Sequence, residues 1–220
     1  VAGGPFLYLV GRHVVDLFGA GDAVARLPVA VVGGLLPMAA LLFRGRMTDG
    51  ETVALAALLA ANPLLVYYSR FLRGDVVAAA FGLVAVGATV RAYDGDGRFA
   101  HLAAASGALA LTASSFAVAY PVAWLVAGLL TLDHDRLLGR PEAARERLAA
   151  LGERLRSGWR TLAGAGAVGG LVLFVFFAPR AGTRGGPGLW KPTTLPAVAE
   201  SAFVGTVRKF LGVRVVHRSP

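Results

Sequence analysis

Residues 67–75 read Tyr67-Tyr68-Ser69-Arg70-Phe71-Leu72-Arg73-Gly74-Asp75, a short polar stretch between two apolar runs. The two runs, residues 52–66 and 76–90, are each close to the length that crosses a bilayer. Arginine presents a planar fork of donors to phosphate oxygens, and tyrosine is enriched at the level of lipid headgroups. Two interpretations follow. The stretch is either a turn at the membrane surface in which Asp75 caps the next helix, or a binding site for a phosphate or a sugar.

The composition indicates a membrane protein. Hydrophobic residues make up 56% of the 220 residues and charged residues only 16%, whereas soluble domains contain about 25% charged residues. The net charge of +9 comes largely from arginines that lie between the apolar runs, which favours lipid headgroups and phosphates over nucleic acid as partners. The chain has no cysteine, and its four histidines match no metal-ligand spacing, so we expect no metal site within it.

The apolar runs predict an all-α fold, a polytopic membrane helix bundle of about six transmembrane helices with interfacial amphipathic helices. The expected spans lie near residues 27–43, 52–66, 76–90, 99–113, 116–132 and 161–178. A turn at residues 112–115 would separate the fourth and fifth spans, and one long tilted helix over residues 99–132 is the alternative.

Interfacial helices are expected at two places. Over residues 5–19 apolar positions recur at helical spacing, and Arg12 and Asp16 lie on the other side. The second, residues 141–160, carries an apolar stripe among many arginines. Residues 1–178 would therefore form the transmembrane domain. Residues 179–220, which are basic and rich in Gly and Pro, are predicted to form an extramembrane segment.

The arginines also predict an orientation, because loops on the cytoplasmic side of a membrane are enriched in positive charge. If the first span runs from outside to inside, eleven arginines lie in inner loops and four in outer positions before residue 179. The outer four are Arg12, Arg26, Arg70 and Arg73. Short turns join the first three spans, so we expect Arg26 to lie close to residues 67–75 on the outer face.

A set of motifs in the first 132 residues resembles one family of membrane glycosyltransferases. The motifs are Gly4-Pro5-Phe6-Leu7-Tyr8, Ala25-Arg26-Leu27-Pro28-Val29-Ala30, Asn62-Pro63-Leu64-Leu65-Val66-Tyr67-Tyr68-Ser69-Arg70 and Asp75. Together they resemble the dolichyl-phosphate-mannose–protein mannosyltransferase-like proteins of the GT-C superfamily. The first motif is similar to one archaeal branch, called flippase activity-associated protein. The chain departs from the family at Gly3, where a histidine is usual, and at Thr112-Ala113, where a Thr-Lys turn is common.

The resemblance implies inverting transfer of a hexose from a polyprenyl-phosphate donor in protein glycosylation. In that family the catalytic acidic residues lie in a first outer loop, so we interpret the chain as a fragment whose catalytic residues lie upstream of Val1. We expect no cofactor in this fragment, while a divalent metal is compatible with the full-length protein. The resemblance assigns Arg26, Arg70 and Arg73 to the lipid phosphate.

The same resemblance assigns Tyr67 and Tyr68 to the sugar or the lipid, and Asp75 to a binding position that is not the family's base. Arg70 and Arg73 would share a face if the helix that precedes them persisted to Arg73.

Two other classes of function stay open. One is a non-catalytic membrane partner in the handling or flipping of lipid-linked sugars. The other is a transporter fragment, which should show internal repeats, and residues 27–90 and 99–178 show none. The expected partners are a polyprenyl-phosphate-linked sugar, membrane lipids and other membrane proteins of the glycosylation pathway, with no nucleic acid. The expected location is the plasma membrane, which the chain would cross several times.

Overall fold

The structure, a computed structural model, describes residues 4–137 and 141–178, and the predicted extramembrane segment lies outside the described residues. The described residues form helices and contain no strand, which confirms the predicted all-α membrane bundle. In chain order the elements are α1 (Pro5–Phe18), α2 (Asp22–Leu35), the 3-10 helix η1 (Leu36–Phe43), α3 (Asp49–Ala61), α4 (Pro63–Tyr68), α5 (Gly74–Tyr93), α6 (Arg98–Ala113), the 3-10 helix η2 (Ser115–Val118), α7 (Ala119–Leu137), α8 (Pro141–Ser157) and α9 (Trp159–Phe177).

Three described segments are long and apolar enough to cross a bilayer. They are Asp22–Phe43, Gly74–Tyr93 and Trp159–Phe177. Two other expected spans fall on shorter helices, because α3 stops at Ala61 before the Asn62-Pro63 break and α6 has only 16 residues. The expected span 116–132 falls on the apolar segment Ser115–Leu130. The count of six spans therefore stays a prediction.

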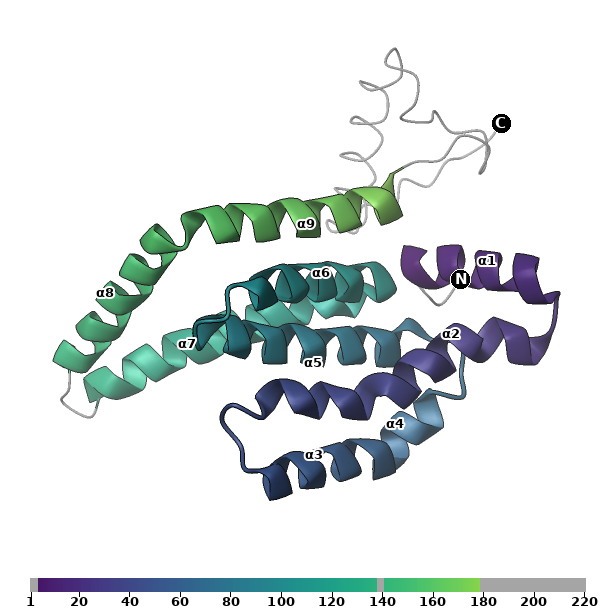
Figure 1. Ribbon diagram of the computed structural model, residues 1–220, viewed down its shortest axis with the longest axis horizontal. Helices are drawn as coiled ribbons and strands as arrows, with labels where there is room; N and C mark the ends of the chain where they lie inside the picture. The colour runs from purple at the N-terminus through teal and green to yellow at the C-terminus, as the bar shows by residue number, and fades with distance from the viewer. Residues whose placement is uncertain (1–3, 138–140, 179–220) are drawn as a thin grey trace, which may run out of the picture. The chain divides into compact units, whose positions relative to one another are not determined.

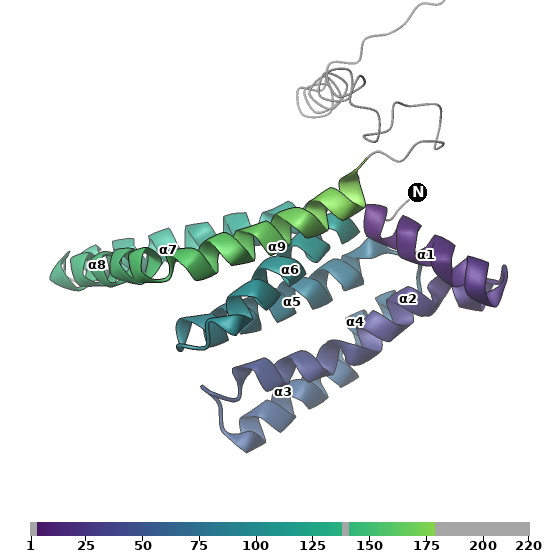
Figure 2. The ribbon, with the colours of Figure 1, turned by 45° about the horizontal axis from the view of Figure 1, so that its top comes forward.

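Small side chains dominate the packing between helices. Helices α5 and α6 run side by side in both ribbon views (Figures 1 and 2), and η1 contacts both α3 and α5. The buried core cluster consists of Phe6, Leu7, Val29, Val77, Ala78, Ala110, Ala113 and Ala117. The four alanines of this cluster let helix backbones approach closely, which is how helices associate in lipid, where apolar burial gives little driving force.

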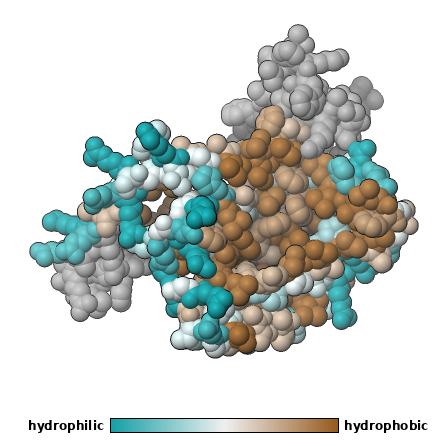
Figure 3. Space-filling view, in the orientation of Figure 1, coloured by the Kyte–Doolittle hydropathy of each residue, from teal (hydrophilic) through white to brown (hydrophobic). Residues whose placement is uncertain are grey.

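The outer surface of the bundle is unusually apolar. Figure 3 shows hydrophobic side chains over a broad part of one face, and hydrophilic side chains gathered toward the left of that view, where Figure 1 draws α8. Large apolar residues such as Leu17, Phe116 and Leu58 are exposed by 79%, 81% and 70%. A bilayer would cover such a surface, whereas exposed patches of this extent are rare on soluble monomers.

Two glycines let the ends of α1 and α5 meet the C-terminal end of α6. The backbone N–H of Gly4 donates to the carbonyl oxygen of Ala113 at 3.0 Å. A Cβ atom at Gly74 would clash with that same oxygen, and one at Gly4 would clash with the carbonyl oxygen of Thr112. The first turn of α5 can therefore lie against the residues that follow α6.

Candidate functional site

The stretch 67–75 forms a turn rather than a continued helix. Asn62 caps α4, since its side-chain oxygen accepts from the backbone N–H groups of Leu64 and Leu65 at 3.0 and 3.3 Å. Helix α4 nevertheless ends at Tyr68, and tight turns over the next residues lead into α5. The condition under which Arg70 and Arg73 would share a helical face is therefore not met.

Asp75 does not cap α5, although the membrane-turn interpretation of the stretch predicts that it does. The N-cap position belongs to Arg73, and Asp75 lies inside the first turn of the helix. A carboxylate there still favours the helix, because it faces the positive end of the helix dipole.

An open pocket of about 760 Å³ lies between α2 and the segment from α3 to the turn after α4. Its polar lining residues are Asp22, Arg26, Ser69 and Arg70, and its other lining residues are Ala23, Ala30, Gly33, Gly34, Pro37, Leu59, Ala60, Leu65 and Val66. We call this the arginine pocket. A Cβ atom at Gly33 would lie 3.0 Å from the Cβ atom of Ser69, so the glycine lets the turn approach α2.

The two arginines of this pocket differ in their partners. Nη2 of Arg26 pairs with Oδ2 of Asp22 at 2.5 Å, and Nη1 of Arg26 donates to the backbone carbonyl oxygen of Arg70 at 3.4 Å. This contact confirms the prediction that Arg26 lies close to the 67–75 stretch. Among the described side chains, Arg70 has no carboxylate within ion-pair distance, so its charge remains available to a ligand.

Arg73 and Asp75 line a second, smaller pocket of about 330 Å³. Nη2 of Arg73 pairs with Oδ2 of Asp75 at 2.7 Å, and the Ser114 hydroxyl donates to Oδ1 of Asp75 at 3.3 Å. The other lining residues are Ala78, Phe116, Ala117 and Tyr120. We call this the Asp75 pocket. It places a carboxylate and a guanidinium opposite aromatic side chains.

The two tyrosines of the stretch line neither pocket. Tyr67 packs edge-on against Tyr68, with ring centroids 5.3 Å apart, and also contacts Phe71. The guanidinium of Arg73 lies 5.6 Å from the ring centroid of Tyr68. The structure thus divides the six candidate residues into Arg26 with Arg70, Arg73 with Asp75, and an exposed aromatic cluster next to Arg73.

The sequence reasoning missed three residues of the Asp75 pocket, namely Ser114, Phe116 and Tyr120. The sequence of residues 112–115 indicates only a turn, and no local pattern connects them to Asp75. The link depends on the close approach at Gly74 and Ala113. Among the described residues, no three His, Asp or Glu side chains gather where they could hold a metal ion.

The two pockets suit different chemical groups. The arginine pocket combines cationic side chains with apolar walls, which suits an amphiphile with an anionic head. In the Asp75 pocket the carboxylate accepts and the guanidinium donates hydrogen bonds, and the rings offer apolar faces, which suits a polyhydroxyl ring.

Comparison with known families gives a match over most of the chain. The sequence model of the family described as dolichyl-phosphate-mannose-protein mannosyltransferase matches residues 3–151. This range includes every residue that lines the two pockets, and it confirms the family resemblance found in the motifs. Comparison with curated proteins and with solved structures gives no match.

Proposed function

The chain belongs to the dolichyl-phosphate-mannose-protein mannosyltransferase family, and on that premise we propose that it binds a polyprenyl-phosphate-linked sugar for transfer to protein. The lipid phosphate binds in the arginine pocket, and the prenyl chain follows its apolar walls. Three candidate spans support a multi-pass membrane protein in contact with lipids. Its place in the plasma membrane and its contact with other glycosylation proteins are part of the same proposal.

The observation that carries this proposal is the unbalanced charge of Arg70 beside an apolar cavity. A phosphate diester needs charge-assisted donors, and a guanidinium can offer two parallel N–H groups to two of its oxygens. Arg26 is already paired with Asp22, so its part is to hold the turn that carries Arg70. During transfer the lipid phosphate leaves with increased negative charge, which a fixed guanidinium stabilises.

The Asp75 pocket receives the sugar. Asp75 already accepts a hydrogen bond from Ser114 and pairs with Arg73, so it is held in a fixed position and suits binding better than proton abstraction. Its carboxylate oxygens accept from sugar hydroxyls, while Arg73 donates to them. Phe116, exposed by 81%, provides an apolar face beside them.

The test is Arg70→Lys, with Arg12→Lys as the matched control. Lysine keeps the charge but loses the fork, so R70K should lower mannose transfer from dolichyl-phosphate-mannose about tenfold to a hundredfold. Arg12 lies on α1 outside both pockets and pairs loosely with Asp16 at 3.8 Å, so R12K should retain normal transfer. Normal transfer by R70K at equal protein level would contradict the proposal.

A further inference from the structure

A second group of arginines surrounds Tyr93 at the C-terminal end of α5. The guanidinium carbon of Arg154, on α8, lies 4.2 Å from the centroid of the Tyr93 ring, and that of Arg46, after η1, lies 5.8 Å from it. Nη1 of Arg154 also donates to the backbone carbonyl oxygen of Tyr93 at 2.8 Å. Segments far apart in the sequence therefore bring their arginines to one aromatic ring.

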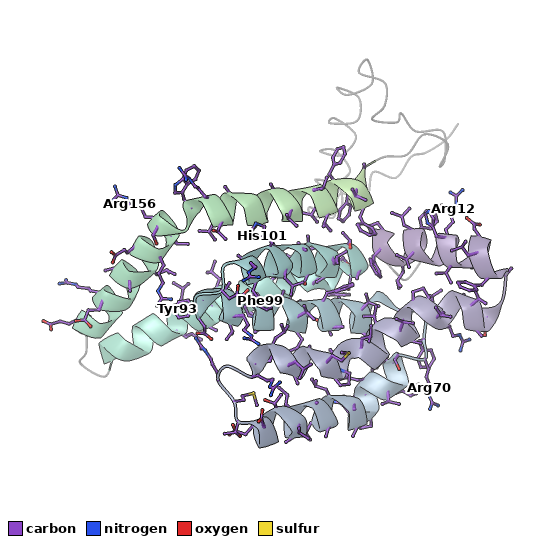
Figure 4. All side chains as sticks on the ribbon, viewed as in Figure 1. Arg12, Arg70, Tyr93, Phe99, His101 and Arg156 are labelled. Carbon is purple, nitrogen blue, oxygen red and sulfur yellow. The ribbon has the colours of Figure 1, made fainter. Side chains whose placement is uncertain are left out.

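Arg91 adds a third guanidinium. It lies in the last turn of α5, with its guanidinium carbon 5.3 Å from the centroid of the Phe99 ring. Figure 4 shows Tyr93 and Phe99 near each other, where α5 ends and α6 begins. We call Arg46, Arg91 and Arg154 the Tyr93 arginine cluster.

One carboxylate, that of Asp94, pairs with this cluster. Its Oδ1 lies 2.6 Å from Nη2 of Arg46, and its Oδ2 lies 3.1 Å from Nε of Arg46. The bond to Arg46, with smaller contributions from Arg154 and Arg91, holds the pKa of Asp94 below its ordinary value, so it is ionised at neutral pH. Three guanidiniums against one carboxylate leave two positive charges unbalanced.

Two acidic residues that lie close to Asp94 and Arg46 in the sequence are paired with other arginines. Asp96 pairs with Arg98 at 3.6 Å, and Asp49 pairs with Arg44 at 3.0 Å. In the described part of the chain, neither Arg91 nor Arg154 has a carboxylate within ion-pair distance, and the buried Nε of Arg91 has no acceptor. The surplus charge therefore belongs to Arg91 and Arg154.

One end of each of the three candidate spans lies close in the sequence to a residue of this cluster. Arg46 follows Phe43 by three residues, Tyr93 is itself the end of a span, and Arg154 precedes Trp159 by five. The ends of spans lie at the height of lipid headgroups, where arginine and aromatic side chains are enriched. On α8, Leu151 and Leu155 flank Arg154 in the sequence and are exposed by 47% and 49%, so acyl chains have an apolar surface beside the charge.

We propose that the Tyr93 arginine cluster binds the phosphate of an anionic phospholipid headgroup. Arg91 and Arg154 supply the charge. Arg46, which is paired with Asp94, packs against the Tyr93 ring and holds it in place. The site is separate from the arginine pocket, since α5 has 20 residues and spans about 30 Å at 1.5 Å per residue. Figure 4 shows the same separation, with Arg70 and Tyr93 far apart. A lipid there would fasten α8 to the ends of α5 and η1.

The test uses the purified chain in a neutral detergent, titrated with dioleoyl-phosphatidylglycerol and read by native mass spectrometry. Arg154→Gln should weaken phosphatidylglycerol binding about tenfold, because it removes one of the two unbalanced charges. Arg156→Gln is the matched control. Arg156 lies two positions away on the same helix and projects away from Tyr93 (Figure 4), so this variant should bind like the unchanged chain. Dioleoyl-phosphatidylcholine should bind much more weakly to all of them.

A second variant separates loss of charge from loss of α8 packing. Arg91→Gln removes the other unbalanced charge without changing α8, and it should also weaken phosphatidylglycerol binding about tenfold. Undiminished binding by R91Q would overturn the proposal, as would equal binding of the two lipids by the unchanged chain. Inorganic phosphate that displaces phosphatidylglycerol at similar concentrations would also overturn it, since the site would then take free anions.

Discussion

The side chain of Arg26 donates to the backbone carbonyl oxygen of Arg70 at 3.4 Å, across 44 positions of sequence. The contact joins α2 to the turn between α4 and α5. It ties the backbone of Arg70 to Arg26, which is itself anchored by Asp22. The two arginines should therefore act as one unit in binding a lipid phosphate.

A double-mutant cycle tests this coupling. If the proposed donor is correct, Arg26→Gln and Arg70→Gln should each lower kcat/KM for dolichyl-phosphate-mannose. The double variant should lose less than the product of the two losses, because R26Q already disturbs what R70Q removes. Residues in contact typically couple by about 0.5–3 kcal/mol. In the control cycle, Arg12→Gln with Arg70→Gln, the losses should multiply. Multiplication in the Arg26 cycle as well would show that the contact does not position Arg70.

Part of this arrangement follows from the sequence. Apolar runs joined by short turns predict the helical bundle, and they place Arg26 near residues 67–75 because consecutive antiparallel helices keep their ends together. The sequence also marks Asn62-Pro63 as a break. It does not show that Asn62 caps a separate six-residue helix, and the end of this helix at Tyr68 decides which pocket each arginine enters.

The Asp75 pocket could not be predicted, for a physical reason. Ser114 reaches Asp75 from 39 positions away, and the approach depends on a glycine whose missing Cβ leaves room for a carbonyl oxygen. Glycines are frequent in this chain, and their spacing does not reveal which of them faces another backbone. Several others, such as Gly11 and Gly107, have no atom within 4 Å of an added Cβ.

Gly74→Ala should therefore be strongly destabilising. The added methyl group would clash with the carbonyl oxygen of Ala113, and neither backbone segment can yield without moving α5 or α6. Overpacking of this kind costs about 1–3 kcal/mol or more. Gly11→Ala is the control, since it lies inside α1 with open space around it and alanine favours helices. Thermal unfolding in detergent, followed by circular dichroism, should show a lower midpoint for G74A alone. A midpoint like that of the unchanged chain would mean that the junction at Ala113 is loose.

The Arg46–Asp94 pair should make stability depend on pH. The bond to Arg46 lowers the pKa of Asp94 from its ordinary 3.8. A carboxyl whose pKa is depressed by folding stabilises the fold above its ordinary pKa and loses this effect as the pH falls through the native value. Asp94→Asn should therefore lower the unfolding midpoint at pH 7, and the difference from the unchanged chain should shrink as the pH falls below 3.8.

The control for this pH experiment is Asp96→Asn. Asp96 meets Arg98 at 3.6 Å, and the Arg98 side chain is 95% exposed, so this pair should contribute little at any pH. If the unfolding midpoints of D94N and the unchanged chain differed by the same amount at pH 7 and at pH 3, the charge of Asp94 would not be the source of the stabilisation.

The predicted orientation can be tested at the two ends of a single candidate span, Asp22–Phe43. Its α-helical part has 14 residues and its 3-10 part has 8, which together give about 37 Å at 1.5 and 2.0 Å per residue. This exceeds the hydrocarbon thickness of about 30 Å, so the ends should lie on opposite sides of the membrane.

The chain has no cysteine, so an introduced cysteine reports without background. Gly21→Cys precedes the span, Gly45→Cys follows it, and neither added Cβ would clash. With an impermeant thiol reagent added to intact cells, G21C should be labelled and G45C should be protected until the cells are opened, because Arg44 and Arg46 belong to the arginine-rich side. Labelling of G45C alone in intact cells would reverse the orientation, and would place the arginine pocket at the cytoplasmic end of the span.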